Sequence, residues 1–273
     1  MTATKSKPGL TAVPETMLWT LHNRAPEAMR PDGIIKDPEA VRIYESIDYD
    51  YKRSFGRSNP THAVRSLTFD KEVQAFLNKH PNGVIVNLGE GLETQRFRVK
   101  GDQALWISVD LPESIEVRER FIQPDENHRH VPLSATDTAW FDEVPADRPL
   151  FVTAQGLFMY FTGSAVRDLL QQMSERFPSA YVMFDVIPVW FSNRTMSGFS
   201  LTSHYTAPKM PWGVNRSDIE VTLRSFVPSL AEVKDISFGN YPRGAPRILL
   251  GIANRLPFIR NVSPSIALIQ FAN

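Results

Sequence analysis

The sequence predicts an α/β protein with a doubly wound, mostly parallel sheet. Between residues 84 and 187, short apolar runs alternate with segments of helical periodicity, which is the order of elements in a sheet with crossover helices. The runs are apolar at nearly every position, as in residues 180–187, and such strands are covered by helices on both faces. A chain of 273 residues, 42% of them hydrophobic, is also long enough for one large core.

We expect residues 1–62 to form a tail and a helical cap. The main domain is expected to span residues 63–273. Residues 1–14 are expected to be a loose tail. Pro14 opens a segment with apolar residues at helical spacing, namely Met17, Leu18, Leu21, Ala25 and Met29. Prolines and glycines break up the chain from there to residue 62, so we expect short helices joined by turns.

The sequence of the main domain predicts the following order of helices and strands. A helix over residues 69–77 ends at Pro81-Asn82-Gly83. Strands are expected over residues 84–88, 104–109, 130–133, 150–154 and 180–187, and helices over 93–99, 112–121 and 164–177. A helix over 217–226 and strands over 232–238 and 266–271 complete the domain.

Residues 190–216 interrupt this alternation and predict a lid insertion. The segment has no clear period and is rich in aromatic residues and methionine: Trp190, Phe191, Met196, Phe199, Tyr205, Met210 and Trp212. Long irregular segments in compact domains are often functional, and such side chains suit a pocket for an apolar ligand. A cover for the sheet and a dimer contact are the alternatives.

Composition excludes several kinds of partner and chemistry. Thirty basic residues balance 30 acidic residues, so no binding to nucleic acid or to an acidic membrane surface is expected. The chain has no cysteine, which rules out disulfides and thiolate chemistry. No signal peptide is apparent, and no run of about 18 apolar residues predicts a transmembrane helix. We therefore expect a cytoplasmic protein.

Two glycines directly after the first expected strand indicate a ligand site. Ligands of doubly wound sheets bind at the carboxyl ends of the strands, where Gly89 and Gly91 let the backbone approach a ligand. Asp110 ends the second expected strand roughly 20 residues later, where a carboxylate can bind ribose hydroxyls. A plain turn, and an aspartate that caps the helix starting at Pro112, are the alternatives.

The residues around these glycines favour a cofactor without phosphate. A dinucleotide site typically reads G-x-G-x-x-G, but Thr94 stands at the third glycine position. Glu90 and Glu93 add negative charge where a pyrophosphate would lie. S-adenosylmethionine fits better, because it carries a sulfonium, an amino group, a carboxylate, a ribose and an adenine.

Four motifs in this order resemble the leucine carboxyl methyltransferase superfamily: NLGEGLET followed by FRV, VDLPE, SATDTAW and TAQGLFMYF. The similarity is greatest to a bacterial branch of the tetracenomycin polyketide O-methyltransferase type. It extends from Pro14 to Asp185 and more weakly to the C-terminus. The resemblance implies a Rossmann-like class I methyltransferase fold, with S-adenosylmethionine as methyl donor and S-adenosylhomocysteine as product.

The resemblance also implies a set of cofactor-binding residues. The glycines would form the loop under the methionine part of the cofactor, and Asp110 would hold the ribose. Ala135 and Asp137 match the stretch that contacts adenine, and Arg65 matches an arginine that binds the cofactor carboxylate, which a guanidinium can grip bidentately. With their neighbours at the strand ends, the candidates are Arg65, Asn87, Gly89, Gly91, Asp110, Leu111, Ala135, Asp137 and Gln155.

Two positions depart from the pattern of the family. Gln155 stands where the family usually has glutamate, so an acceptor oxygen is kept and the charge is lost. Gln95 stands where the family often has arginine. The first departure bears on the contact with the cofactor's amino group.

The expected reaction is O-methylation of a carboxylate or hydroxyl on a small apolar, polyketide-like acceptor, either free or tethered to a carrier protein. A carboxylate is ionised at pH 7, so catalysis would rest on positioning and on exclusion of water. A phenol would require a base, for which His204 is the candidate. Tyr160 and Tyr205 are candidates for orienting the acceptor, with ordinary packing as the alternative.

Other chemistries have less support. His128 and His130 lie on one face of a short strand but lack a third ligand at suitable spacing, so no metal is expected. Gly198-Phe199-Ser200 lacks the second glycine and the preceding strand of a nucleophile elbow, which argues against a serine hydrolase. Arginines 243, 247, 255 and 260 alternate with apolar residues, and we expect an amphipathic helix there. An anchor for an anionic substrate or an acidic carrier is the alternative.

Two other functions stay open at this point. One is a methyltransferase that esterifies the C-terminal carboxylate of a protein, as in the eukaryotic branch of the superfamily. The other is a nucleotide-binding protein without methyltransferase activity, such as a reductase, a regulatory module or a catalytically silent cofactor binder. The sequence also leaves open whether the protein is a monomer or a homodimer.

Overall fold

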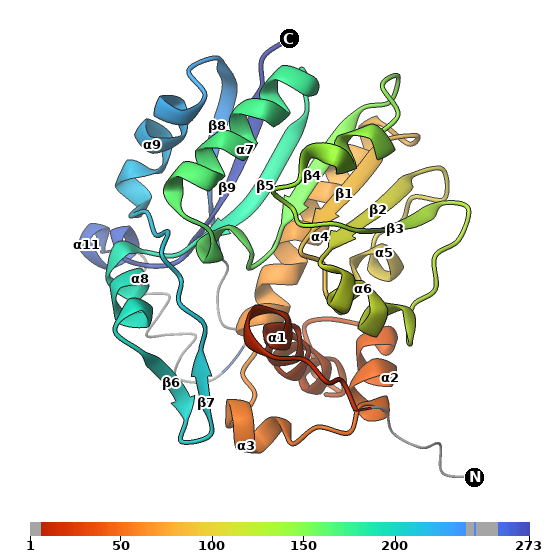
Figure 1. Ribbon diagram of the computed structural model, residues 1–273, viewed down its shortest axis with the longest axis vertical. Coiled ribbons are helices and arrows are strands. Elements are labelled where there is room, and N and C mark those ends of the chain that lie inside the picture. Colours follow the sequence, from red (N-terminus) through yellow and green to blue (C-terminus); the bar gives the residue numbers. More distant parts are fainter. Residues whose placement is uncertain (1–6, 239–242, 244–255) are drawn as a thin grey trace.

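A computed structural model of the chain describes residues 7–238, 243 and 256–273. Its centre is a seven-stranded sheet in the order β3-β2-β1-β4-β5-β9-β8 (Figure 1). The strands are β1 (Val84–Leu88), β2 (Leu105–Asp110), β3 (His128–Pro132), β4 (Leu150–Ala154), β5 (Tyr181–Val186), β8 (Leu230–Ser237) and β9 (Ser265–Phe271). Neighbouring strands are parallel except where β9 pairs with β5 and β8. The predicted doubly wound, mostly parallel sheet is confirmed.

The strand order reverses next to β1. The chain passes from β1 to β2 and β3 on one side, and then returns to place β4 and β5 on the other side of β1. Such a reversal opens a crevice at the carboxyl ends of the two central strands. All five residues of β1 and of β4 are buried, because helices cover both faces of the sheet at this point.

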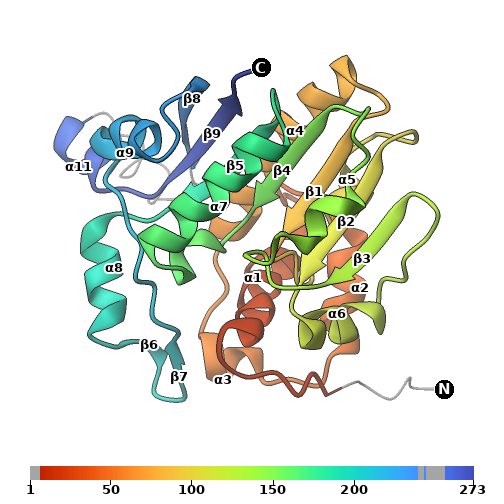
Figure 2. The same cartoon turned by 45° about the horizontal axis from the view of Figure 1, so that its top comes forward.

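Helices and short 3-10 turns surround the sheet (Figure 2). They are α1 (Ala12–Ala28), α2 (Pro38–Ser46), α3 (Tyr51–Phe55), α4 (Thr61–Lys79), α5 (Gln95–Arg98), α6 (Pro112–Glu119), α7 (Gly163–Arg176), α8 (Val189–Met196), α9 (Ile219–Phe226) and α11 (Pro257–Asn261), with 3-10 turns η1 (Thr138–Glu143), η2 (Phe158–Tyr160) and η3 (Arg216–Asp218). The helices α7 and α9 and the turn η1 pack on one face of the sheet, and α4 packs on the other.

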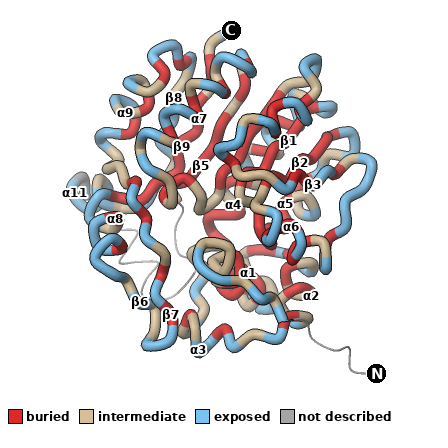
Figure 3. Tube along the Cα trace, in the orientation of Figure 1, coloured by how far each residue is buried: buried red, intermediate tan, exposed pale blue. Residues whose placement is uncertain are grey.

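The helices α1, α2 and α3 lie across the carboxyl ends of the strands (Figures 1 and 2). They share an apolar cluster that also contains Leu92, Met159, Tyr205 and Met210. Burial therefore continues from the sheet into this layer, as the run of buried positions along α1 shows (Figure 3). The layer closes the crevice that the sheet alone would leave open.

The segment expected to be an irregular lid contains regular structure. Residues Val189–Met196 form α8, and β6 (Phe199–Thr202) pairs with β7 (Tyr205–Ala207) as a hairpin. The expectation of an irregular segment was wrong for α8, because the buried residues of this helix are the polar Ser192 and Thr195. Trp190 is 54% exposed, so no buried apolar stripe marks the helix in the sequence.

Part of the C-terminal arginine stretch falls outside the described residues. The amphipathic helix expected there involves residues 239–242 and 244–255, which the structure does not describe. Arg243 itself binds the carboxylate of Glu27 through both terminal nitrogens, at 2.7 and 2.8 Å. The short helix α11 follows, and its residues Phe258 and Ile259 are exposed.

Candidate active site

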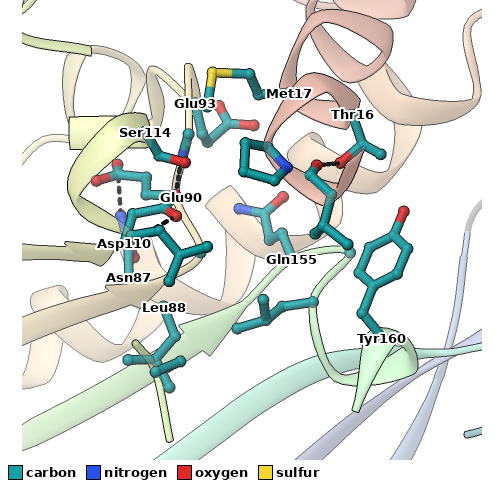
Figure 4. A pocket seen from close by; sticks show the side chains of 18 of the residues that line it. Thr16, Met17, Asn87, Leu88, Glu90, Glu93, Asp110, Ser114, Gln155 and Tyr160 are labelled. Atoms are coloured by element: carbon teal, nitrogen blue, oxygen red, sulfur yellow. Dashed lines mark hydrogen bonds between the residues drawn. The ribbon is translucent and has the colours of Figure 1, made fainter. Parts of the chain in front are cut away.

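A cavity of about 290 Å³ lies at the carboxyl ends of β1, β2 and β4. The helix α1 forms its opposite wall (Figure 4). The lining comprises Val13, Pro14, Thr16, Met17, Thr20, Arg65, Asn87, Leu88, Gly89, Glu90, Gly91, Glu93, Asp110, Leu111, Ser114, Ser134, Ala135, Thr153, Gln155, Gly156, Leu157, Tyr160 and Phe161. Its position next to the reversal of strand order is where doubly wound folds bind ligands.

The two glycines after β1 form the loop that the sequence indicated. Gly89 and Gly91 have φ angles of +61° and +51°, a region that L-residues other than glycine rarely adopt. A Cβ atom on Gly91 would lie 2.8 Å from Cβ of Met17 in α1, and one on Gly89 would lie 2.7 Å from Cδ1 of Leu157. Both close approach and backbone conformation therefore require glycine here.

Asp110 both holds this loop and lines the cavity. Its Oδ2 accepts a hydrogen bond from the Gly91 amide at 2.7 Å, and its Oδ1 accepts one from the Leu111 amide at 2.8 Å. Burial raises the pKa of the Asp110 carboxyl, and the bonds from the two amides partly oppose that shift. A carboxylate oxygen has more than one lone pair, so these bonds leave capacity for a ligand.

The glutamates of the loop are paired rather than free. Asn87 Nδ2 donates to Glu90 Oε1 at 2.9 Å, and Glu90 forms an ion pair with Arg118. Glu93 binds Arg24 at 2.9 Å and Arg98 at 2.8 Å. Both glutamates line the cavity, as the sequence indicated, and buried guanidiniums balance their charge. Their repulsion of a pyrophosphate is therefore weaker than that of free carboxylates.

An ion pair and two atoms without partners occupy the side of the cavity near β4 and α4. Arg65 Nη1 binds Asp185 Oδ2 at 3.0 Å, and the amide of Gly156 donates to the other oxygen of Asp185. Among the residues that the structure describes, Arg65 Nε is a buried donor without a partner, and Gln155 Oε1 is a buried acceptor without a partner. Buried polar atoms are normally satisfied, so a ligand that carries both an acceptor and a donor suits this end.

Other predicted residues fall in two groups. Asn87, Leu111, Ala135 and Tyr160 line the cavity. Asp137 is exposed and caps η1 by accepting a bond from the Ala139 amide at 3.0 Å.

The two candidates from the insertion are not among the residues that line the cavity. His204 is exposed in the turn between β6 and β7. Tyr205 is buried, with its ring 4.8 Å from that of Phe55, and its hydroxyl has no partner. Burial raises the pKa of the Tyr205 phenol. The hairpin thus packs on α3, where Thr202 Oγ1 donates to the carbonyls of Arg53 and Ser54.

Sequence reasoning missed the contribution of α1 to the cavity. Val13, Pro14 and Met17 line it, although in the sequence Met17 belongs to the amphipathic pattern of a packing helix. Thr153 was also missed, and its hydroxyl donates to Asn87 Oδ1 at 2.7 Å across the two central strands. A polar residue near the end of an apolar strand is the only local signal for it.

The paired histidines are satisfied by protein groups. His128 contacts Ser108 Oγ at 2.8 Å, and His130 contacts Glu119 at 3.1 Å. Burial, followed by the charge of Arg118, lowers the pKa of His128 to about 2. Within the described ranges no group of three or more histidine, aspartate or glutamate residues is placed to hold a metal ion.

Comparison with known proteins places the chain in a family. The sequence profile described as leucine carboxyl methyltransferase matches residues 18–174, more than half of the chain. The chain belongs to the leucine carboxyl methyltransferase family. It is 32% identical over 227 residues to the tetracenomycin polyketide synthesis O-methyltransferase TcmP of Streptomyces glaucescens, and the match covers 81% of each protein.

Two further comparisons agree with this assignment. The S-adenosyl-L-methionine-dependent methyltransferase dpfgK of Gibberella zeae is 29% identical over 194 residues, covering 64% of this chain and 65% of that relative. The solved CurJ carbon methyltransferase has a TM-score of 0.52 at 12% identity, covering 95% of this chain and 68% of that one. The structural likeness concerns the fold alone, which is that of class I methyltransferases. The chain is an S-adenosylmethionine-dependent methyltransferase.

The two departures from the family pattern have different surroundings in this methyltransferase. Gln155 lies at the cavity with its free oxygen. Gln95 is fully buried away from the cavity lining, and its Nε2 donates to Asp70 at 3.0 Å. Arg98 supplies the guanidinium that binds the same aspartate, at 2.7 Å.

In the part of the chain that the structure describes, no helix is long and apolar enough to cross a membrane.

Proposed function

We propose that this methyltransferase transfers a methyl group to a carboxylate or hydroxyl oxygen of a small apolar acceptor. The observation that carries the proposal is one cavity that is lined by both polar and apolar side chains. Asp110, Arg65 and Gln155 line it together with apolar side chains of α1, Leu157 and Phe161. Apolar pockets with a few convergent polar groups bind small apolar ligands. The name of the relative TcmP, a polyketide O-methyltransferase, points the same way.

The polar side chains of the lining fit S-adenosylmethionine. Asp110 would accept hydrogen bonds from the ribose hydroxyls, and Ala135 with Ser134 would border the adenine. Arg65 would hold the carboxylate, for which its unpartnered Nε is free, and Gln155 Oε1 would accept from the amino group. When bound, the cofactor supplies an electrophilic methyl group on its sulfonium.

The residues of this chain would act by orienting the acceptor and excluding water. The helix α1 covers the cavity, so the acceptor would react in a site with little solvent. Burial raises the pKa of Tyr160 to about 12, so at neutral pH its phenol is protonated and donates a hydrogen bond to the acceptor. A carboxylate acceptor is already ionised and requires no base. A hydroxyl acceptor would have to lose its proton, and His204 is the proposed base. Because His204 is exposed and outside the lining, it could act only if the β6–β7 hairpin moved toward the cavity.

The acceptor is proposed to be a polyketide-like metabolite, either free or tethered to a carrier protein. The enzyme is proposed to be cytoplasmic and to work as a monomer or a homodimer. The cap is proposed to comprise residues 1–62, and the lid about residues 190–216. Methylation of a protein C-terminus is the alternative within the same family.

Calorimetric titration tests the cofactor assignment. We expect the wild-type protein to bind S-adenosylmethionine and S-adenosylhomocysteine but not NAD. Asp110→Ala is expected to lower the affinity for S-adenosylmethionine and for S-adenosylhomocysteine by about 10- to 100-fold, because a charge-assisted hydrogen bond contributes about 1.5–3 kcal/mol. Asp137→Ala is the matched comparison, since its carboxylate is exposed outside the lining. NAD binding, or unchanged affinity in Asp110→Ala, would contradict the assignment.

An acceptor screen then tests the reaction. Aromatic carboxylates, phenols, the same acids as carrier thioesters, and short peptides with a free C-terminus are each incubated with labelled cofactor. Turnover of apolar small molecules supports the proposal. Turnover of peptides alone would replace it with protein carboxyl methylation.

A further inference from the structure

Two buried arginines hold the loop of residues 89–93 from outside the cavity. The side chain of Arg118 in α6 is fully buried, and that of Arg24 in α1 is 1% exposed. Neither residue belongs to the cavity lining. They reach the same loop from two different helices, on the side away from the ligand space.

Their guanidiniums bind three consecutive carbonyl oxygens of this loop. Arg118 Nη1 donates to Gly91 O at 2.8 Å and to Glu93 O at 2.9 Å. Arg24 Nη2 donates to Leu92 O at 2.8 Å. Because a peptide unit is planar, fixing its carbonyl also fixes the direction of its N–H group. The three bonds therefore determine how the loop backbone faces the cavity.

Each arginine also binds a carboxylate of the loop. Arg118 Nη2 lies 3.2 Å from Glu90 Oε2, and Arg24 Nη1 lies 2.9 Å from Glu93 Oε2. The several donors of a guanidinium allow backbone and carboxylate to be held together, which an ammonium group does less well. These two arginines thus neutralise the loop carboxylates and also bind the loop carbonyls.

We propose that Arg24 and Arg118 are positioning residues, which hold the loop in its cofactor-binding conformation before the cofactor arrives. The inference rests on the proposed assignment of the cavity to S-adenosylmethionine. Without the two guanidiniums, the loop would be held less firmly before binding, and the conformational entropy lost on binding would reduce affinity. Because Arg24 belongs to α1, the same contact also fixes the helix that lines the cavity.

Lysine substitutions test the proposal, since lysine keeps the charge but offers one point of contact. In Arg118→Lys and Arg24→Lys we expect the Kd for S-adenosylhomocysteine, measured by calorimetry, to rise about 10- to 100-fold. KM for S-adenosylmethionine should rise similarly, while kcat at saturating cofactor changes by less than about two-fold. Arg120→Lys is the control, because Arg120 directly follows the same helix as its C-cap and pairs with the exposed Glu116.

A second set of variants separates charge from hydrogen bonding. Arg118→Met alone leaves Glu90 buried and unpaired, which destabilises the fold. The double variant Arg118→Met with Glu90→Gln removes both charges and still leaves the carbonyls of Gly91 and Glu93 without their donor. We expect it to bind S-adenosylhomocysteine about 10-fold more weakly than Glu90→Gln alone. Equal affinities of these two proteins would show that Arg118 acts only through Glu90 and would overturn the proposal.

Hydrogen exchange in the ligand-free protein provides a readout that needs no cofactor. The amides of Gly91 and Glu93 are hydrogen-bonded within the loop, to Asp110 and to Glu90 O, and should exchange faster in both lysine variants than in Arg120→Lys. Unchanged exchange would overturn the proposal. If the wild-type protein bound no S-adenosylhomocysteine, the cofactor assignment would fail, and the exchange rates alone would decide on the loop.

Discussion

Gln155 follows β4 with its side-chain oxygen buried and without a partner. A buried acceptor left unpaired costs about 1–3 kcal/mol, so the position disfavours the free protein and favours a ligand that donates a hydrogen bond. The amide thus offers an acceptor to the cavity without adding a negative charge.

We predict opposite effects of Gln155→Met on stability and on binding. The free energy of unfolding should stay the same or rise, because the unpaired oxygen is gone. Affinity for S-adenosylhomocysteine should fall by about 10-fold, the value of one lost hydrogen bond. Urea unfolding and calorimetry on the same variant measure both, with Gln172→Met on the exposed side of α7 as control. A joint loss of stability and affinity would show a structural role instead.

Tyr160 is the predicted acceptor residue that lies at the cavity. With a pKa of about 12 it remains a donor throughout the neutral range. Tyr160→Phe is therefore expected to lower kcat/KM for a carboxylate acceptor by about 10-fold. The shape of the pH profile should not change, because no ionisation of Tyr160 contributes to it.

Tyr205→Phe is the comparison for Tyr160→Phe. Its hydroxyl has no partner among the described residues, and Tyr205 is not one of the residues that line the cavity, so its removal should leave activity unchanged and should not destabilise the protein. A loss of activity in Tyr205→Phe, or in His204→Ala with a phenol acceptor, would show that the hairpin enters the active site during turnover.

At the scale of elements, α1 and the glycine loop depend on one another. Gly91 has a φ of +51°, and an added Cβ would lie 2.8 Å from Cβ of Met17, an atom fixed to the helix backbone. The helix cannot stay in place unless position 91 lacks a side chain. This contact joins the N-terminal layer to the end of β1.

Gly91→Ala should therefore displace α1 as well as strain the loop. We expect a loss of unfolding free energy of about 2–4 kcal/mol, from backbone strain and overpacking together, with loss of cofactor binding. Gly9→Ala, at a φ of +65° with no atom within 4 Å of the added Cβ, measures strain alone. Equal destabilisation in the two variants would argue against the contact with α1.

For the whole molecule, one buried network of charges joins α1 and the start of α2 to α4, α5 and the loop after β1. Glu93 binds Arg24 and Arg98, and Arg98 also binds Asp37 and Asp70 at 2.7 Å. Burial alone would raise the pKa of Glu93, but the two guanidiniums outweigh it and hold the pKa well below its usual range. In Asp70, burial prevails and the pKa is raised. Breaking such a pair on one side is strongly destabilising.

The network predicts how stability changes with pH. Because the pKa of Glu93 is lower in the folded than in the unfolded protein, its stabilisation is complete above the usual value of 4.5 and is lost as the pH falls below it. Glu93→Gln should lower the free energy of unfolding by about 3–5 kcal/mol at pH 7. Urea unfolding from neutral to acidic pH should show this difference shrinking. A difference independent of pH would contradict the assigned charge of Glu93.

From the amino-acid sequence alone, we could predict the order of the central strands and helices, the glycine loop and the acidic strand end. These features depend on local physics: apolar runs mark strands buried on both faces, and Gly89 and Gly91 supply a backbone conformation that other residues avoid. The resemblance to a methyltransferase family followed from the same short motifs, and the comparisons confirmed it.

Tertiary contacts determine which charges meet and what closes the cavity. Arg24 and Glu93 are 69 residues apart in the chain, and Arg65 and Asp185 are 120 apart. Periodicity shows that a side chain is polar or apolar, but the topology determines its partner. The sequence therefore showed the charge of the loop glutamates but not the guanidiniums that balance it. It also showed α1 as an amphipathic helix but not as a wall of the cavity.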